Sequence, residues 1–521
     1  MSDSGNTETR DEAQNVAAQG TVVASMTFIS RITGFARDVV LSHFFGATPV
    51  ADAFFVAFRI PNFFRRLFAE GAFNQAFVPV LVRYKESGGE PLRRFVAVMA
   101  GNLALSVCVL VLLGVVFAPL FTAVFAPGFI GSERYQLTSD LLQITFPYLL
   151  FVSLVAFSGA ILNAHHRYAV PAITPVFLNL CLLVAASLGW LYAEEPVFVL
   201  AWGVFAAGLV QWLFQIPSLK RVGMLVAPRP SFRHEGARQV GRLLVPAVFA
   251  ASVSQINALI DTILASMLVT GSVSWLYYSD RLLELPIGLV AVALGTVLLP
   301  NLSRLDARGQ PEAFSATLDW GMSLGLMLGL PAGVALYVLA DPLIGTIFFH
   351  GALGAYDVVM SSLALQAFAV GVLPMLLVKI LAPAYFARED TRTPFRIGVV
   401  AVAVNIVVNL SVFSWFGHVG LALATSISAC VNAYLLLRGL MKSGSYQPGH
   451  RCITTLLQAG AAAGVMAATL IAFVPDLQWW LEVDLWTRIF ALTGVVAGGG
   501  GLYLAALFAV GVRPRHLMHA A

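Results

Sequence analysis

Charged residues whose chemistry suits anion binding stand inside apolar segments near the start of this chain of 521 residues. Residues 21–45 are long enough to cross a membrane, yet they contain Arg31, Arg37 and Asp38. A charge near the centre of a bilayer costs about 2.5–3.5 kcal/mol on insertion scales. We therefore expect these residues to pair with one another or to line a wet cavity.

The next apolar segment, residues 51–82, carries five more charged residues: Asp52, Arg59, Arg65, Arg66 and Glu70. At 100° per residue all of them except Arg65 fall within about 40° of one another on a helix, although Pro61 is expected to bend it. Arg66 and Glu70, four residues apart, can form an ion pair.

Arginines outnumber acids in these two segments, so some guanidinium groups require an anion from outside the protein. The planar guanidinium can donate two parallel hydrogen bonds to a phosphate. We therefore expect an anionic substrate that carries phosphate or diphosphate. Internal salt bridges that hold the helices together are the alternative, above all for Arg66 with Glu70 and for a second cluster, Asp280, Arg281 and Glu284.

The composition indicates the class of protein that positions these charges. Hydrophobic residues make up 59% of the chain and charged residues 11%, whereas a soluble domain is about 25% charged. The mean hydropathy is +0.83. Apolar runs of about 20 residues predict an all-α polytopic membrane protein with about 14 transmembrane helices. The cysteines and histidines have no metal-ligand spacing, so no transition-metal site is expected.

Loop charges predict the orientation of the chain in the membrane. With the N-terminus taken as cytoplasmic, the loops and tails of that side hold 22 of the 31 lysines and arginines, and the other side holds two. Because positive residues concentrate in cytoplasmic loops, both termini are expected in the cytoplasm.

The chain also resembles itself at an offset of 221 to 223 residues. Val78-Pro79 followed by Arg83 matches Leu299-Pro300 followed by Arg304, and Arg59 matches Arg281. Each repeat contains six predicted helices, and an even number gives both copies the same orientation. Two such lobes, related by an axis along the membrane normal, are typical of alternating-access transporters.

These patterns predict six parts of the chain. They are a disordered cytoplasmic tail (1–20), an N-terminal lobe of six helices (21–221), a basic cytoplasmic linker (222–237), a C-terminal lobe of six helices (238–442), two additional helices (450–511) and a cytoplasmic tail (512–521).

A group of oxygen-bearing residues in the second half suits a hard cation. Asp261 stands in one predicted helix, Asn405 and Asn409 lie on one face of another, and Thr425 is in the next. Oxygen ligands around one carboxylate suit Na⁺. A polar network that packs helices together is the alternative.

Three long motifs resemble the MurJ (MviN) lipid II flippase family, within the multidrug/oligosaccharidyl-lipid/polysaccharide exporter superfamily. They are Ser-Arg-Ile-Thr-Gly-Phe-Ala-Arg-Asp at 30–38, the run from Ala51 to Phe73, and Trp-Leu-Tyr-Tyr-Ser-Asp-Arg-Leu at 275–282. The resemblance extends over the chain after residue 20. It implies a bacterial inner-membrane protein, not an enzyme, that moves lipid II, an undecaprenyl-diphosphate-linked disaccharide pentapeptide, to the periplasmic leaflet for peptidoglycan synthesis.

The resemblance also assigns roles to residues and partners. It implies that Arg31, Arg37, Arg65 and Arg281 bind the diphosphate or line the path to it, and that the acids Asp38, Asp52, Glu70 and Asp280 act in the cavity or in gating. The two additional helices would hold the isoprenoid tail, and cell-wall synthesis proteins are potential partners. Some relatives bind sodium where Asp261, Asn405, Asn409 and Thr425 fall, but Asn409 replaces an expected aspartate. No cofactor other than Na⁺ is implied.

Other functions compete with this interpretation. A flippase or exporter for another polyprenyl-diphosphate-linked oligosaccharide would need the same arginines. A multidrug antiporter of the superfamily would favour an acidic, aromatic cavity for cationic drugs, whereas this cavity is basic. A membrane glycosyltransferase or phosphatase would need a carboxylate pair or a phosphatase motif, and neither is found. An anion channel would not need a groove for an isoprenoid tail.

Overall fold

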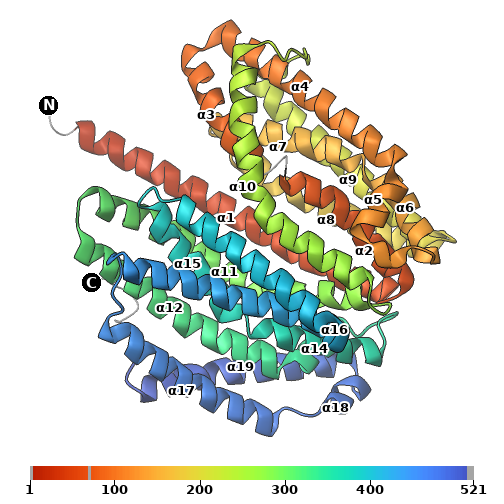
Figure 1. Cartoon of the computed structure of the whole chain (residues 1–521), viewed down its shortest axis with the longest axis vertical. Coiled ribbons are helices and arrows are strands. Elements are labelled where there is room, and N and C mark those ends of the chain that lie inside the picture. Colours follow the sequence, from red (N-terminus) through yellow and green to blue (C-terminus); the bar gives the residue numbers. More distant parts are fainter. Residues whose placement is uncertain (1–3, 68–71, 513–521) are drawn as a thin grey trace. The chain divides into compact units, whose positions relative to one another are not determined.

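The computed structural model describes residues 4–67 and 72–512, and the secondary structure of this part consists of helices without strands (Figure 1). Contacts divide the chain into two compact units. The first consists of Met1–Phe45 and Pro49–Ile263, and the second of Gly46–Thr48 and Leu264–Ala521. The prediction of an all-α protein is confirmed.

The first unit is built from ten helices, of which the last continues into the second unit. They are α1 (Ser4–Phe45), α2 (Pro49–Phe64), α3 (Ala72–Ser87), α4 (Gly89–Val116), α5 (Ala118–Phe125), α6 (Glu133–Thr145), α7 (Tyr148–Ala164), α8 (Ala169–Tyr192), α9 (Pro196–Arg221) and α10 (Glu235–Ser266). A short 3₁₀ turn, η2 (Pro127–Phe129), precedes α6. Residues 4–20, expected as a disordered tail, belong to α1, because their Glu, Ala, Gln and Arg are good helix formers.

The second unit contains the remaining helices. They are α11 (Ser272–Ala307), α12 (Pro311–Val338), α13 (Ala340–Ile347), α14 (Ala355–Ala369), α15 (Val372–Phe386), α16 (Arg392–Lys442), α17 (His450–Phe473), α18 (Leu477–Glu482) and α19 (Leu485–Ala509). Helix α16 is two helices joined at a bend. Gly417 has φ 56° and ψ −136° there, a conformation that a residue with a Cβ rarely adopts. The bend divides α16 into two arms, one before and one after Gly417.

The internal repeat is visible in the helix boundaries. α4 and α12 each have 28 residues and begin at 89 and 311, whereas α5 and α13 each have eight and begin at 118 and 340. The turns after α7 and α15 also match, because each contains a non-glycine residue with positive φ, His166 at 58° and Glu389 at 59°. Identical lengths and equivalent turns indicate that the two units repeat one helical pattern.

Fewer of the described helices qualify as membrane spans than the sequence predicted. Eight described helices are long and apolar enough to cross a membrane, or nine if the bent pair α14 and α15 is one span. One of the eight is the two-armed α16. The apolar segment 51–82 of the sequence analysis contains parts of α2 and α3, of 16 residues each, which are too short to span a membrane alone. The count of 14 therefore stays a prediction.

The predicted linker does not separate the units. Asn102 in α4 donates from Nδ2 to the Ser231 carbonyl (3.1 Å) and accepts from the Ser231 amide (2.7 Å), while the Arg229 amide donates to the Ala97 carbonyl. Val240, in α10, then joins the core of the first unit around Phe77 and Phe95. The boundary consequently falls inside α10, after Ile263, and not within 222–237.

The helices beyond the repeat pack on the second unit. Helix α17 lies beside α12 and α19 (Figure 1). Its residues Ala459, Ala462, Ala463 and Met466 are buried in the core that these helices share. The Tyr503 hydroxyl on α19 donates to the Met327 carbonyl on α12 at 2.7 Å. Close packing of small side chains and buried hydrogen bonds are the forces that join helices within a membrane.

Arg488 fastens the start of α19. Its side chain is 8% exposed and donates to three carbonyls: Nε to Val483 (3.0 Å), and Nη1 to Gly345 and Phe349 (3.1 Å each). The guanidinium also lies over the Phe349 ring, 4.9 Å from its centroid. Arg488 thus links α19 to the end of α13.

We predict that Arg488→Met lowers the free energy of unfolding by about 2–3 kcal/mol, because a charged group's hydrogen bonds are lost and buried carbonyls remain unsatisfied. Thermal unfolding of the purified protein in detergent measures this change. Arg438→Met removes an exposed arginine of α16 and is the matched control. Equal midpoints for the two variants would contradict the anchoring role.

Candidate functional site

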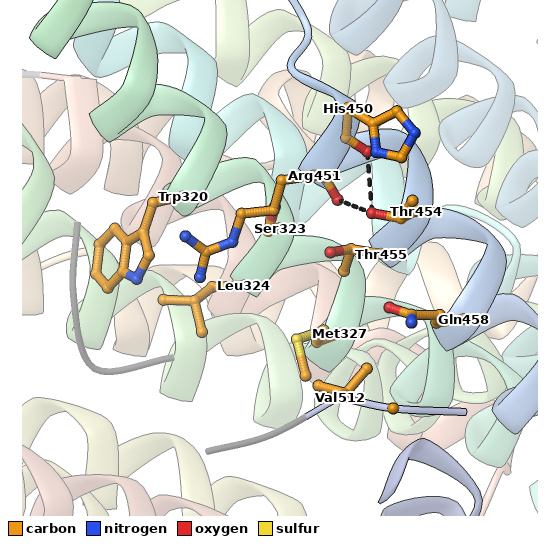
Figure 2. Close-up of a pocket in the computed structure, with 11 residues that line it drawn as sticks. Trp320, Ser323, Leu324, Met327, His450, Arg451, Thr454, Thr455, Gln458 and Val512 are labelled. Carbon is orange, nitrogen blue, oxygen red and sulfur yellow. Dashed lines mark hydrogen bonds between the residues drawn. The ribbon is translucent and has the colours of Figure 1, made fainter. Parts of the chain in front are cut away.

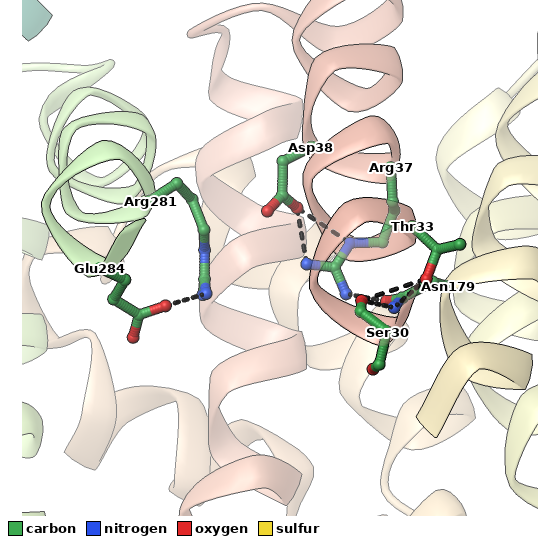
Figure 3. A network of polar contacts seen from close by, with 7 residues as sticks. All are labelled: Ser30, Thr33, Arg37, Asp38, Asn179, Arg281 and Glu284. Carbon is green, nitrogen blue, oxygen red and sulfur yellow. Dashed lines mark hydrogen bonds and ion pairs between the residues drawn. The ribbon is translucent and has the colours of Figure 1, made fainter. Parts of the chain in front are cut away.

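Arg37 occupies the centre of a buried polar network in α1. Its Nε and Nη2 donate to Asp38 Oδ1 at 2.9 and 2.6 Å, and its Nη1 donates to Asn179 Oδ1 at 2.9 Å. Arg37 is 8% exposed and Asp38 1% exposed. Figure 3 shows the guanidinium held between Asp38 and Asn179. The carboxylate and the amide together fix the plane of the guanidinium.

Asn179, in α8, connects that network to the backbone of α1. Its Nδ2 donates to the Ser30 carbonyl (3.0 Å) and to Thr33 Oγ1 (3.1 Å), and it is 6% exposed. The orientation of the amide follows from these partners, since Nδ2 must donate and Oδ1 must accept. Asn179 therefore acts on Arg37 as a positioning residue.

Arg31 and Arg65 differ from Arg37 in their surroundings. Arg31, two turns earlier in α1, is exposed, and among the described residues it has no hydrogen-bond or ion-pair partner. Arg65 lies in a π-helical turn that follows α2, is half-buried, and donates from Nε to the neutral Asn62 Oδ1 at 3.0 Å. Both arginines can present positive charge to an anion.

The predicted acids lie in distinct places. Asp52, fully buried at the start of α2, lies 3.7 Å from Nη1 of Arg134, whose guanidinium covers the Phe129 ring at 4.4 Å. Arg59, predicted on the same face as Asp52, donates to Thr262 Oγ1 at 2.9 Å. Glu70 lies outside the described residues, as does its expected pairing with Arg66, which is exposed.

The second unit contributes Arg281 from α11. Its Nη1 donates to Glu284 Oε2 at 2.9 Å, and its guanidinium stacks 4.7 Å from the centroid of the Tyr277 ring. Asp280 is half-buried beside it. The predicted cluster is therefore a local ion pair, one turn of helix long, with an aromatic neighbour. An arginine in such an exposed ion pair can exchange the carboxylate of Glu284 for an anionic ligand.

Of the four candidate sodium ligands, Asn405, Asn409 and Thr425 lie close together in the second unit. Asn409 Nδ2 donates to Asn405 Oδ1 at 2.7 Å, and Asn405 Nδ2 lies 3.5 Å from Thr425 Oγ1; both asparagines are fully buried. Asp261 belongs to the first unit, where Asn257 Nδ2 lies 3.5 Å from its Oδ2. Across the described residues, no three His, Cys, Asp or Glu side chains are grouped to hold a metal ion.

Sequence reasoning missed two residues of this site. Asn179 is a polar side chain in the apolar helix α8, and that was a usable signal, since polar groups inside membrane helices need partners. Arg134 carried no such signal, because the sequence assigned it to a loop, whereas it belongs to the first turn of α6, far from Asp52 in sequence. Only the fold brings those two together.

Comparison with known proteins covers nearly the whole chain. Residues 41–490 match the family described as lipid II flippase MurJ. A Vibrio cholerae serotype O1 protein described as a probable lipid II flippase MurJ is 44% identical over 515 residues, which cover 97% of this chain and 98% of that relative.

Solved structures agree with that match. One, described as lipid II flippase MurJ in an inward closed conformation, has a TM-score of 0.79 at 28% identity and covers 93% of this chain and 98% of its own. An inward-facing multidrug resistance transporter of the MATE family and MOP superfamily has a TM-score of 0.66 at 14% identity, covering 82% of this chain and 98% of its own. The second likeness shows a shared fold.

We predict that Asn179→Leu lowers the free energy of unfolding by about 1–3 kcal/mol, because the buried Arg37 donor and the Ser30 carbonyl lose their partner. Chemical unfolding in detergent measures the loss. Ser187→Ala on the same helix is the matched control, since that hydroxyl donates only to the Leu183 carbonyl of its own helix, at 2.9 Å. If both variants unfold at the same denaturant concentration, Asn179 does not hold Arg37.

Proposed function

We propose that this chain, which belongs to the MurJ family of lipid II flippases, moves lipid II from the cytoplasmic to the periplasmic leaflet. It is a multi-pass protein of the bacterial inner membrane. The observation that most directly supports the proposal is the buried Arg37 network, in a chain that matches a relative of that name over 97% of its length. We place its mechanism in the alternating-access class.

The arginines supply the chemistry that a diphosphate requires. Guanidinium groups donate paired hydrogen bonds to phosphate oxygens, and these charge-assisted bonds are about twice as strong as neutral ones. Arg37 is held in a fixed orientation, so less conformational entropy is lost when a ligand binds. Arg31 and Arg65 add positive charge in the first unit, and Arg281 adds it in the second.

The acids beside these arginines neutralise their positive charge when no substrate is bound. Asp38 and Glu284 neutralise Arg37 and Arg281 in the structure. A diphosphate that arrives can take the place of one carboxylate without leaving a guanidinium unpaired. Asp52, Glu70 and Asp280 remain proposed cavity or gating acids on the basis of their motif positions.

Two alternatives are weaker. Transport of another polyprenyl-diphosphate-linked oligosaccharide would use the same arginines, so only substrate comparison separates it from lipid II transport. A multidrug antiporter function has support from fold alone, at 14% identity, and the arginines of the first unit oppose cationic drugs. The mechanism requires no covalent step, so we infer that the protein is not an enzyme.

The proposal also covers the orientation of the chain in the membrane, the place of the isoprenoid tail and the partner proteins. From the excess of lysine and arginine in the loops and tails of one side, we infer that both termini lie in the cytoplasm. The additional helices α17 and α19 would accommodate the isoprenoid tail in the surrounding lipid. Proteins of cell-wall synthesis are the proposed partners, since they consume the transported precursor.

We predict that Arg37→Ala reduces lipid II flipping in proteoliposomes at least about tenfold, because a charge-assisted contact to diphosphate is worth more than 1.4 kcal/mol. Arg37→Lys will restore little, since an ammonium cannot donate the same planar pair. Arg438→Ala, which removes an exposed arginine, is the control and should flip at the wild-type rate. Full flipping by the alanine variant, present in the membrane at normal level, would refute the role of Arg37. Faster flipping of a different diphosphate-linked oligosaccharide would favour the alternative substrate.

We also propose that Asn405, Asn409 and Thr425, which lie together in the second unit, form a weak sodium site. An uncharged ligand set binds Na⁺ less tightly than one with a carboxylate, so Asn409→Asp should lower the sodium concentration for half-maximal flipping about tenfold. Ser411→Asp, whose side chain is exposed on the same helix, adds an equal charge outside the group. Flipping that is identical in sodium and in choline for wild type and both variants would show that this group only packs helices.

A further inference from the structure

A cavity of about 420 Å³ opens in the second unit where α17 begins and α19 ends (Figure 2). Its wall is formed by one face of α12, by the first turns of α17 and by the residues just after α19. The side chains that matter here are Trp320, Ser323, Met327, Arg451, Gln458 and Val512. None of them belongs to the arginine network or to the sodium candidates.

The hydroxyl of Ser323 is the first feature that indicates a ligand-binding role for the cavity. It is 5% exposed, it lines the cavity, and its hydroxyl has no hydrogen-bond partner among the described residues. Most serines in membrane helices donate to a carbonyl one turn earlier, as Ser187 does to Leu183. A buried hydroxyl without a partner carries a desolvation cost that a bound acceptor would remove.

Arg451 supplies charge at the same wall. It stands in the first turn of α17, is half-buried, and extends across the cavity toward Trp320 and Ser323 (Figure 2). A guanidinium and a hydroxyl directed into one space are donors that suit a phosphate. Trp320 at the rim suits the boundary between membrane and water, where tryptophan side chains concentrate.

Asp319 already occupies the N-terminus of α17, so this helix terminus is not what would bind an anion in the cavity. Its Oδ1 accepts from the Tyr446 hydroxyl and from the Gly449 amide, at 2.9 Å each, so the carboxylate already covers that helix terminus. Burial, followed by the neighbouring Cys452 and Asp319, raises the pKa of Tyr446, and the phenol stays protonated as a donor. These bonds hold the start of α17, and hence Arg451, in place.

Part of the cavity lining is apolar. Leu324, Met327 and Val512 form that part, and Met327 belongs to the core that α17 and α19 form on α12. Gln458 Nε2 donates to the Val510 carbonyl at 2.8 Å and ties the two additional helices together beside the cavity. A lining that is basic and polar in one part and apolar in another is the arrangement in which membrane proteins bind lipid head groups.

We propose that this cavity binds an anionic phospholipid, with Arg451 and Ser323 donating to oxygens of its phosphodiester and the acyl chains lying toward Leu324 and Val512. The site lies at the start of α17, which carries Arg451, and after the end of α19. The preceding helix, α16, ends with Arg438 and Lys442 in its last two turns, and this end of the helices is cytoplasmic in the proposed orientation. The bound lipid is a resident of the protein and is distinct from the lipid that is transported. The proposal holds whichever substrate is moved.

Native mass spectrometry of the purified full-length protein, titrated with phosphatidylglycerol, tests the proposal. Arg451→Gln should weaken binding of the first phosphatidylglycerol about tenfold, and Ser323→Ala about threefold, since each removes a donor to the phosphate. Arg438→Gln makes the same charge change at an exposed position outside the cavity and should bind as wild type does. Midpoints of thermal unfolding confirm that each variant is folded.

Three ligand comparisons separate the sources of phosphate. Phosphatidylcholine should bind more weakly than phosphatidylglycerol, because its choline opposes Arg451, and inorganic phosphate should fail to compete because it lacks acyl chains. Equal losses for Arg451→Gln and Arg438→Gln would mean non-specific attraction and would overturn the proposal. So would full competition by inorganic phosphate, or a loss at Arg451→Gln seen with lipid II but not with phosphatidylglycerol.

Discussion

A guanidinium inside a membrane helix must keep its donors hydrogen-bonded, because hydrocarbon offers none of the partners that water does. Arg37 meets this requirement through Asp38 on its own helix and Asn179 on α8. The local packing follows from it: α8 packs against α1, and Asn179 also donates to the Ser30 carbonyl. The hydrogen bonds that stabilise the Arg37 guanidinium also fix its orientation, which in the proposed function favours binding of an anion.

The neutralising partners also limit how tightly a ligand can bind. In the proposed function, a diphosphate that binds Arg37 would have to displace or share the carboxylate of Asp38, so part of its attraction would be offset. Moderate affinity suits a transporter, which must release what it binds. Arg31, exposed in α1, has no such competing carboxylate among the described residues, and in the proposed function it would meet the head group first.

Much of this could be predicted from the sequence, because membrane helices and repeats leave strong local signals. Apolar periodicity predicted the helical class, and matched prolines and turns predicted the repeat that α4 and α12 display. Contacts between distant segments could not be predicted. Arg134 meets Asp52, and Arg59 meets Thr262, only because the chain folds back on itself. The start of α1 and the unit boundary within α10 were also missed, since helix propensity and core packing there outweigh the charge pattern.

The most direct measurement is the affinity of wild-type protein and of an Arg37→Met variant for two lipids, lipid II and an analogue whose diphosphate is replaced by an uncharged linker. If Arg37 binds the diphosphate, the substitution will weaken lipid II binding about tenfold or more and leave the affinity for the analogue unchanged. An equal loss of affinity for both lipids would contradict diphosphate recognition by Arg37 and would leave that arginine a purely structural role.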